Sequence, residues 1–299
     1  MKAFITGANG FVGGWLSDWL KSNGDEVSSL NEKTDINDED SMLNELEAFG
    51  PDVIYHLAAL SHVGDSWGNP KEVFEVNALG TLTLTEVIKR LKTSPRLLIV
   101  SSAEVYGKVD EAELPISETR VVNPMTSYAV SKVSAEYIGL QAFQNGLDVI
   151  VVRPFNHVGP KQSDKFVISG LAKRIVEAKL SGSNQIIVGN LSSRRDYTDV
   201  RSVVKGYRLL IDNGKAGEIY NICSGVDRSV LDIATELIRI AGVDIELVRD
   251  PALSRSSDVP VLRGNASKIE SATGWQVDID FISTLKDTLD YWEEVLTRI

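Results

Sequence analysis

The stretch Thr6-Gly7-Ala8-Asn9-Gly10-Phe11-Val12-Gly13 decides the fold of this chain. It follows a short apolar strand predicted over residues 2–6 and precedes a helical pattern over residues 11–22. Glycines at such a junction permit a tight turn, close approach of a phosphate to the backbone, and close packing of the helix on the strand. The amino terminus of the helix then offers free N–H groups and a favourable dipole to an anion. The stretch therefore predicts a dinucleotide-binding site.

Strands and helices alternate along the next 150 residues. Further strands are predicted over residues 26–30, 53–57, 96–101 and 149–152, and helices over 38–49, 70–91 and 127–145. This alternation predicts a parallel sheet with helices on both faces. Beyond Pro154, loops rich in Gly, Ser and Asn separate helices expected near 165–180, 200–213, 229–241 and 281–297. We therefore expect an α/β fold, a doubly wound parallel sheet of the Rossmann type with a smaller mixed α/β carboxy-terminal lobe.

Composition limits the partners of the chain. Its 299 residues, 43% of them apolar, suit one or two domains with a large core. A net charge of −11 argues against nucleic acid and anionic membrane, so an anionic ligand must meet a local basic pocket. No apolar run approaches the roughly 20 residues of a membrane span. Residues 1–6 already begin a strand, so no signal peptide is expected. The single cysteine, Cys223, fits a buried thiol in a reducing cytoplasm.

The segment Ser127-Tyr128-Ala129-Val130-Ser131-Lys132 carries a candidate acid. Tyr128 and Lys132 are four residues apart and share one face of the predicted helix. An ammonium beside a phenol stabilises the phenolate and is expected to lower the tyrosine pKa. Tyr128 could then pass a proton to or from a sugar or alcohol oxygen near neutral pH. On its own, such a pair is also common on a surface helix.

Three segments in this order resemble the extended short-chain dehydrogenase/reductase family: the glycine-rich loop, Val100-Ser101-Ser102-Ala103-Glu104-Val105-Tyr106-Gly107, and the Tyr128/Lys132 pair. The resemblance covers nearly the whole chain. It implies that Ser102 hydrogen-bonds the substrate oxygen, that Tyr128 is the general acid, and that Lys132 holds the ribose. Glu104 stands where the sugar-nucleotide 4,6-dehydratases carry a base, but related reductases also keep a Glu there. Its role is therefore catalytic, substrate-binding or structural.

The resemblance also implies the cofactor contacts. Asp35 would accept a hydrogen bond from the adenine amine and Ile36 would pack on its ring, although a turn or helix cap also explains Asp35. The second strand ends without an acid for the ribose, and Asn31 and Lys33 could receive a 2′-phosphate, which Glu32 would oppose. This favours NADPH slightly over NADH. The other expected contacts are Gly7, Asn9, Gly10, Phe11, Val12, Leu57, Ala58, Ala59, Asn77, Ser101, Tyr128, Lys132 and Pro154.

The substrate side begins at Phe155-Asn156-His157-Val158-Gly159-Pro160-Lys161-Gln162, followed by Phe166-Val167. This stretch resembles the reductases of GDP-4-keto-6-deoxy-mannose within the family. Asn156, Arg195 and Arg255 can converge on a diphosphate, which arginine binds bidentately. Arg194 is interpreted as a surface ion pair. The remaining expected contacts are Val167 against guanine, Lys173 near the nucleotide, and Ser61, Ser102 and Glu104 near the sugar. His56, His62 and His157 are interpreted as structural, and no metal-ligand spacing appears.

The resemblance implies reduction of the C4 keto group of GDP-4-keto-6-deoxy-D-mannose to GDP-D-rhamnose for surface polysaccharide synthesis. A GDP-mannose 4,6-dehydratase, a nucleotide-sugar epimerase and a non-catalytic dinucleotide sensor stay open. Ala103 replaces the Asp of dTDP-glucose dehydratases and argues against that substrate. The expected domains are 1–155, to which about 197–224 returns, and a substrate lobe in the rest of 156–299. A homodimer is expected across the helices 70–91 and 127–145, with Val73, Val76, Leu84 and Val87 as candidate contacts.

Overall fold

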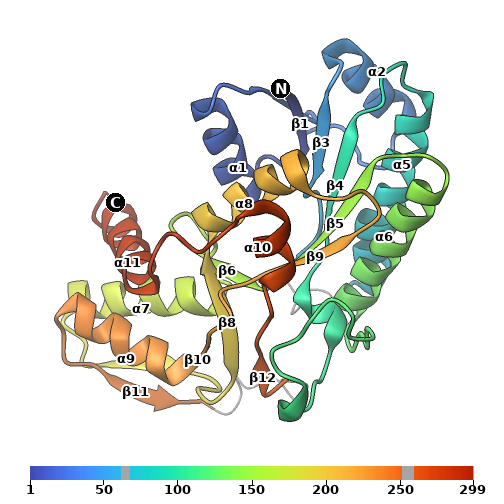
Figure 1. Ribbon diagram of the computed structural model, residues 1–299. Coiled ribbons are helices and arrows are strands. Elements are labelled where there is room, and N and C mark those ends of the chain that lie inside the picture. Colours follow the sequence, from blue (N-terminus) through green and yellow to red (C-terminus); the bar gives the residue numbers. More distant parts are fainter. Residues whose placement is uncertain (62–67, 251–258, 299) are drawn as a thin grey trace.

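The fold is seen in a computed structural model that describes residues 1–61, 68–250 and 259–298 (Figure 1). Six parallel strands form the main sheet in the order β2-β1-β3-β4-β5-β9. These strands are β1 (Lys2–Thr6), β2 (Glu26–Ser29), β3 (Val53–His56), β4 (Arg96–Val100), β5 (Val149–Pro154) and β9 (Ile219–Ile222). The direction of winding reverses between β1 and β3. Open sheets of this kind bind ligands at that reversal, outside the carboxyl ends of the strands.

Helices cover both faces of this sheet, as the alternation predicted (Figure 1). Ala3 and Ile5 of β1 pack with α1 (Phe11–Ser22) and α8 (Val200–Asn213) on one face. Phe4 between them packs on the other face, with α2 (Glu39–Phe49), α5 (Gly80–Arg90) and α6 (Ser127–Gln144). Successive strand residues point to opposite faces, so a strand buried on both sides is apolar throughout. The doubly wound fold is therefore confirmed.

The helix predicted over residues 70–91 is interrupted by a π-helical turn. The structure divides it into α4 (Pro70–Phe74), the π-helix η1 (Glu75–Leu79) and α5. Asn77 lies in this turn, and its side chain accepts from the amide of Leu60 at 2.8 Å and donates to the hydroxyl of Ser131 at 2.9 Å. Such π-turns frequently occur at functional sites. Here the turn ties the loop after β3 to α6.

A second lobe lies below the carboxyl edge of the sheet (Figure 1). Its core is formed by α7 (Val167–Ser181), α9 (Val230–Ala241) and α11 (Phe281–Thr297). Short strands flank these helices: β6 (Asn156–Val158), β7 (Gln185–Val188), β8 (Arg194–Asp199), β10 (Asp227–Ser229), β11 (Glu246–Arg249) and β12 (Val261–Leu262). Between β8 and β10 the chain returns to the main sheet as α8 and β9. α10 (Ser267–Thr273) then packs against α8 and β9.

The apolar side chains expected to contact a second copy lie mostly inside this chain. Of the four candidate contacts to a second copy, Val73, Leu84 and Val87 are buried in this chain and Val76 is half-buried. Leu84 and Val87 belong to its own core, and Val76 packs against that core. Leu84 and Val87 point inward because the apolar stripe of α5 must cover the sheet. In the part of the chain that the structure describes, no helix has both the length and the apolar character to cross a membrane.

Candidate active site

A cleft of about 960 Å³ lies at the carboxyl edge of the main sheet, where the second lobe meets it. Loops after β1, β3, β4 and β5 line it from one side, and α7 and β8 contribute from the other. Of the residues expected from the sequence, it is lined by Gly7, Gly10, Phe11, Val12, Leu57, Ala58, Ala59, Ser61, Ser101, Ser102, Glu104, Tyr128, Lys132, Pro154, Asn156, Val167 and Arg195. Residues far apart in sequence thus share one cleft.

The glycine-rich loop forms a cradle that side chains would fill. Gly7 has φ +77°, and a Cβ there would lie 2.7 Å from the amide nitrogen of Ala58. A Cβ on Gly13 would lie 2.1 Å from the carbonyl oxygen of Gly7. The first turn of α1 has neither a side-chain cap nor an acidic residue, so its amides are available to an anion. This donor set fits the pyrophosphate of a dinucleotide.

Tyr207 supports the same conclusion. It lies on α8 in the core that contains β1 and α1, and it lines the cleft. Its hydroxyl oxygen is buried without a hydrogen-bond partner in the structure. Buried polar groups are rarely left unpaired, because desolvation without a hydrogen bond costs free energy. An orphaned hydroxyl at the cleft fits a site that a polar ligand completes.

Tyr128 and Lys132 are both buried on the inner face of α6. This helix begins after Thr126, whose hydroxyl accepts from the amide of Ala129 at 3.1 Å. Tyr128 shares a hydrogen bond with Ser102. The Lys132 Nζ donates to the carbonyl oxygen of Val100 at 2.8 Å and lies 6.0 Å from the centre of the Tyr128 ring. The predicted helix face therefore brings the Tyr128 hydroxyl, the Lys132 ammonium and the Ser102 hydroxyl to one place.

The expected lowering of the Tyr128 pKa is wrong for this structure. Burial raises the pKa of Tyr128 to about 12, and the hydrogen bond with Ser102 only partly offsets it. Burial also lowers the pKa of Lys132 to about 8, against the opposing charge of Glu136. Removing both groups from water disfavours both charged forms, which the four-residue spacing alone does not reveal. Tyr128 therefore keeps its proton at neutral pH, as a general acid must.

A buried ion pair that the sequence does not reveal lies behind Lys132. Arg153 donates from Nε and NH2 to the two carboxylate oxygens of Glu136, at 2.8 and 2.7 Å. Ser101 Oγ donates to the same carboxylate, and Arg153 NH1 donates to the Tyr106 hydroxyl at 3.0 Å. The sequence offers one indication of this site: Glu136 follows Lys132 by four residues, so both lie on one helix face.

A second, smaller pocket lies beside the glycine-rich loop and is lined by Asn9, Ser29, Leu30, Asn31, Glu32, Lys33 and Glu45. Asn9, Asn31 and Lys33 thus meet where the second strand ends. The adenine contacts expected from Asp35 and Ile36 are not placed in either pocket. Asp35 accepts from the amide of Asn37 at 2.9 Å, which is the turn role considered for it. Ile36 is buried in the core beside Gly80 because the turn directs it under α5.

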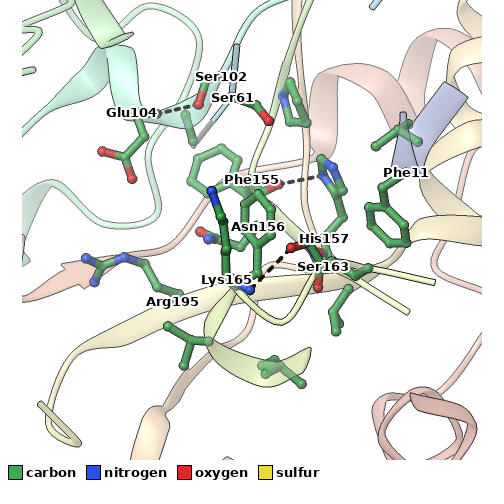
Figure 2. A pocket seen from close by; sticks show the side chains of 18 of the residues that line it. Phe11, Ser61, Ser102, Glu104, Phe155, Asn156, His157, Ser163, Lys165 and Arg195 are labelled. Carbon is green, nitrogen blue, oxygen red and sulfur yellow. Dashed lines mark hydrogen bonds between the residues drawn. The ribbon is translucent and has the colours of Figure 1, made fainter. Parts of the chain in front are cut away.

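One lysine that was expected to lie near the nucleotide lies outside the cleft. Lys173 does not line the cleft, because its Nζ pairs with Asp164 at 2.7 Å and lies over the Trp292 ring. Lys165 and Arg174 line the cleft instead. Figure 2 shows Arg195 and Glu104 on one side of the cleft and Phe11 on the other. Arg195 NH1 donates to the carbonyl of Val259 at 2.6 Å.

Arg194, His56 and His157 have ion-pair or hydrogen-bond partners within the fold. Arg194 pairs with Asp227 at 2.5 Å, as expected, whereas Arg255 lies outside the described residues. His56 lies between the hydroxyls of Thr6 and Thr81 at 2.8 and 2.9 Å, and burial followed by the charge of Lys132 lowers its pKa to about 3. Burial lowers the pKa of His157 to about 4. Within residues 1–61, 68–250 and 259–298, no cluster of His, Cys, Asp or Glu could hold a metal ion.

Several known proteins are similar to this chain. The GDP-6-deoxy-D-mannose reductase of Pseudomonas aeruginosa is 37% identical over 98% of this chain and 97% of its own length. The GDP-6-deoxy-D-talose 4-dehydrogenase of Aggregatibacter actinomycetemcomitans is 32% identical, with 92% of each chain covered. The solved structure of RMD from Pseudomonas aeruginosa complexed with NADPH has a TM-score of 0.92 at 36% identity, covering 100% of this chain and 99% of that one. A family model described as GDP-mannose 4,6 dehydratase matches residues 4–288. The chain therefore belongs to the GDP-mannose 4,6 dehydratase family of short-chain dehydrogenases/reductases.

Proposed function

We propose that this protein reduces the C4 keto group of GDP-4-keto-6-deoxy-D-mannose with NADPH and releases GDP-D-rhamnose. The observation that carries the proposal is the convergence of Ser102, Tyr128 and Lys132 in one cleft with the glycine cradle. The similarity to a GDP-6-deoxy-D-mannose reductase over 98% of the chain supports the substrate. The reaction would take place in the cytoplasm and supply a deoxy sugar for surface polysaccharide.

The reaction adds one hydride and one proton to a ketone. When bound, NADPH would supply the hydride that adds to C4. Ser102 donates a hydrogen bond to the C4 oxygen, which fixes the ketone beside Tyr128. Tyr128 gives its proton to that oxygen as negative charge develops there, and the product is a secondary alcohol. Lys132 would hold the ribose hydroxyls of the cofactor and, as a nearby cation, would stabilise the tyrosinate that remains.

The cofactor would lie across residues 1–155 and the returning segment 197–224. The amides at the start of α1 would hold the pyrophosphate, with Gly7 and Gly13 providing the space. Asn31 and Lys33 would meet the 2′-phosphate, and Glu32 and Glu45 in the same pocket would oppose it. A structural neighbour is complexed with NADPH, which supports this form of the cofactor over NADH.

A GDP-mannose 4,6-dehydratase is the alternative, and Glu104 is the observation that favours it. Glu104 lines the cleft two residues after Ser102, whose hydroxyl accepts from the Glu104 amide at 3.2 Å (Figure 2). A carboxylate there could remove a proton from C5 of a bound sugar. In the proposed reductase, Glu104 binds the substrate instead.

Cofactor consumption separates the two functions. GDP-4-keto-6-deoxy-mannose would be made in situ, and oxidation of NADPH and of NADH would be followed at 340 nm. Oxidation in proportion to sugar consumed is expected, and NMR of the product would show the C4 configuration of rhamnose. If no nicotinamide is consumed but GDP-mannose becomes the 4-keto sugar without added cofactor, the protein is the dehydratase and the proposal is wrong.

Arg195 should contribute strongly to substrate binding. Replacing Arg195 with alanine removes a guanidinium from the cleft, and we expect KM for the nucleotide sugar to rise about 10- to 100-fold, because a hydrogen bond to a charged group is worth about 1.5–3 kcal/mol. Arg194→Ala is the matched control, since Arg194 precedes it on β8 but pairs with Asp227. Steady-state kinetics would measure both. Equal effects of the two replacements would remove Arg195 from the site.

We also propose a homodimer through the face formed by α4, η1, α5 and α6, which pack together. Apolar side chains at least 40% exposed lie along it: Phe74, Leu79, Leu82, Val130 and Tyr137. Tyr137→Glu would place a charge in this face and is expected to reduce the mass in light scattering from two chains to one. Ile187→Glu, an exposed apolar position on β7, is the control and should stay dimeric. A parent protein of one-chain mass would refute the dimer.

A further inference from the structure

Glu136 is a buried carboxylate that the proposed reaction does not use. Its side chain is 1% exposed, on the same face of α6 as Lys132 and one helical turn further along. Carboxylates are almost never this buried without partners, because desolvation of the charge is expensive. Its position directly behind the proposed cofactor-binding lysine requires an explanation.

The partners of Glu136 come from two different strands. Arg153, on β5, donates two parallel hydrogen bonds at 2.8 and 2.7 Å, the bidentate geometry that makes such pairs strong. Ser101, at the end of β4, donates its hydroxyl proton to the same carboxylate. The carboxylate of α6 therefore joins the carboxyl ends of two central strands.

Each partner is adjacent in the chain to a residue of the proposed site. Ser101 lies between Ser102 and Val100, whose carbonyl accepts from Lys132 at 2.8 Å. Arg153 immediately precedes Pro154, which lines the cleft. A shift of the Glu136 carboxylate would therefore move the strand ends on which the hydroxyl, the ammonium and the cleft wall depend.

We propose that Glu136 is a positioning residue of the active site, which docks the ends of β4 and β5 on α6 and keeps the Lys132 side chain charged and bound at Val100. It acts through Lys132, Ser101 and Arg153 and does not contact the reacting atoms. This inference rests on the proposed roles of Lys132 and of the dinucleotide site.

The charges around Lys132 support this role. Lys132 interacts electrostatically with His56 of β3 and with Glu136 on its own helix, and its Nζ lies 6.0 Å from the centre of the Tyr128 ring. Glu104 of η2 (Ala103–Tyr106) acts on Tyr128, and Tyr106 pairs with Arg153. Burial lowers the pKa of Lys132 to about 8, and the charge of Glu136 opposes that shift. On α4, η1 and α5, exposed ion pairs join Lys71 to Glu75, Lys89 to Glu86, and Arg90 to Glu39 of α2, and Glu72 accepts from the side chain of Asn69.

The charge of Lys132 sets the pH dependence expected of cofactor binding. A lysine that is neutral cannot hold the ribose as a cation, so NADPH binding should weaken as the pH rises through the Lys132 pKa. Without the Glu136 charge, burial is no longer opposed and the pKa of Lys132 falls further below its usual value. The pH at which binding weakens should therefore move to lower values.

Glu136→Gln tests this, because the amide keeps the size and can still accept from Arg153. NADPH affinity would be measured by fluorescence titration from pH 6 to 10, together with the pH profile of kcat/KM, which reports ionisations of the free enzyme. We expect the alkaline limb of the binding curve and of the kcat/KM profile to move to lower pH by at least one unit. At pH 6, the affinity and kcat/KM of the variant should be nearest those of the parent. If NADPH binding by Glu136→Gln keeps the pH dependence of the parent and only the melting temperature falls, the proposal is wrong.

Two further variants keep the test decisive. Tyr106→Phe removes a hydrogen bond to Arg153 at 3.0 Å but no charge, so it should leave the alkaline limb in place. If Glu136→Gln fails to fold, the double variant Glu136→Gln, Arg153→Met removes the whole pair and should still shift the limb to lower pH. The binding titration needs no sugar, so a wrong substrate assignment would leave it interpretable, whereas absence of NADPH binding by the parent would refute the proposed function itself.

Discussion

Replacing Tyr128 with phenylalanine is expected to lower kcat by about 10²- to 10⁴-fold, the usual contribution of a positioned general acid. The hydroxyl that shares a hydrogen bond with Ser102 would be absent, and the C4 oxygen would have no proton donor as charge develops on it. The ring would still fill its buried place on α6, so the fold should persist. NADPH affinity, measured by fluorescence, should change little, because the cradle at α1 is untouched.

Tyr291→Phe is the matched control for this experiment. Tyr291 lies on α11 in the second lobe and does not line the cleft, so its hydroxyl should be dispensable for turnover. Turnover of Tyr128→Phe at the parent rate would contradict the assignment of the acid. Glu104, which also lines the cleft, would then be the group to test next.

Replacing Gly13 with alanine should weaken NADPH binding about 10- to 100-fold, since forcing a methyl group into closely packed structure costs about 1–3 kcal/mol. The added Cβ would lie 2.1 Å from the carbonyl oxygen of Gly7 and 2.7 Å from the Cα of Ala8. Both neighbours are backbone atoms, so no flexible side chain can move aside. The loop itself would shift, and with it the amides that face the pyrophosphate.

Gly14→Ala gives a control one residue further along the same helix. A Cβ at Gly14 would meet only the carbonyl oxygen of Ala8, at 3.9 Å, which is an ordinary contact. Alanine also has a higher helix propensity than glycine, so this variant should bind NADPH normally and unfold at an equal or higher temperature. Fluorescence titration and thermal unfolding of the pair would show whether the close approach at Gly13 matters for binding. Similar affinities for both variants would contradict it.

Local patterns were sufficient to predict most of the main sheet and its helices. The bounds of α1, α8 and α11 agree with the helices expected over 11–22, 200–213 and 281–297. The small strands of the second lobe, such as β6 and β12, were not predicted, because two or three residues carry no readable periodicity. The π-turn at Asn77 depends on hydrogen bonds to Leu60 and Ser131, which are distant in sequence.

The sequence predicts which side chains meet where helix spacing decides their position. It predicts their pKa values less well, because these depend on burial. The helix spacing of Tyr128 and Lys132 placed both in the cleft, but it gave the wrong direction for the Tyr128 pKa, since spacing contains no information on desolvation. On α7, a basic residue was expected at 173, whereas the helix turns Arg174 toward the cleft. Neighbouring residues of a helix point about 100° apart. Which of them faces the cleft can therefore be identified only when the packing of the helix is known.

The return of α8 and β9 to the main sheet makes the first lobe depend on chain that follows the start of the second lobe. The chain leaves the sheet after β5, builds part of the second lobe, and then comes back to cover Leu16 and Leu20 of α1 with α8. A fragment ending at Pro154 would lack an edge strand and expose the apolar face of α1 to water. The first lobe is therefore not an excisable unit, and we expect a fragment of residues 1–154 to show no cooperative unfolding transition.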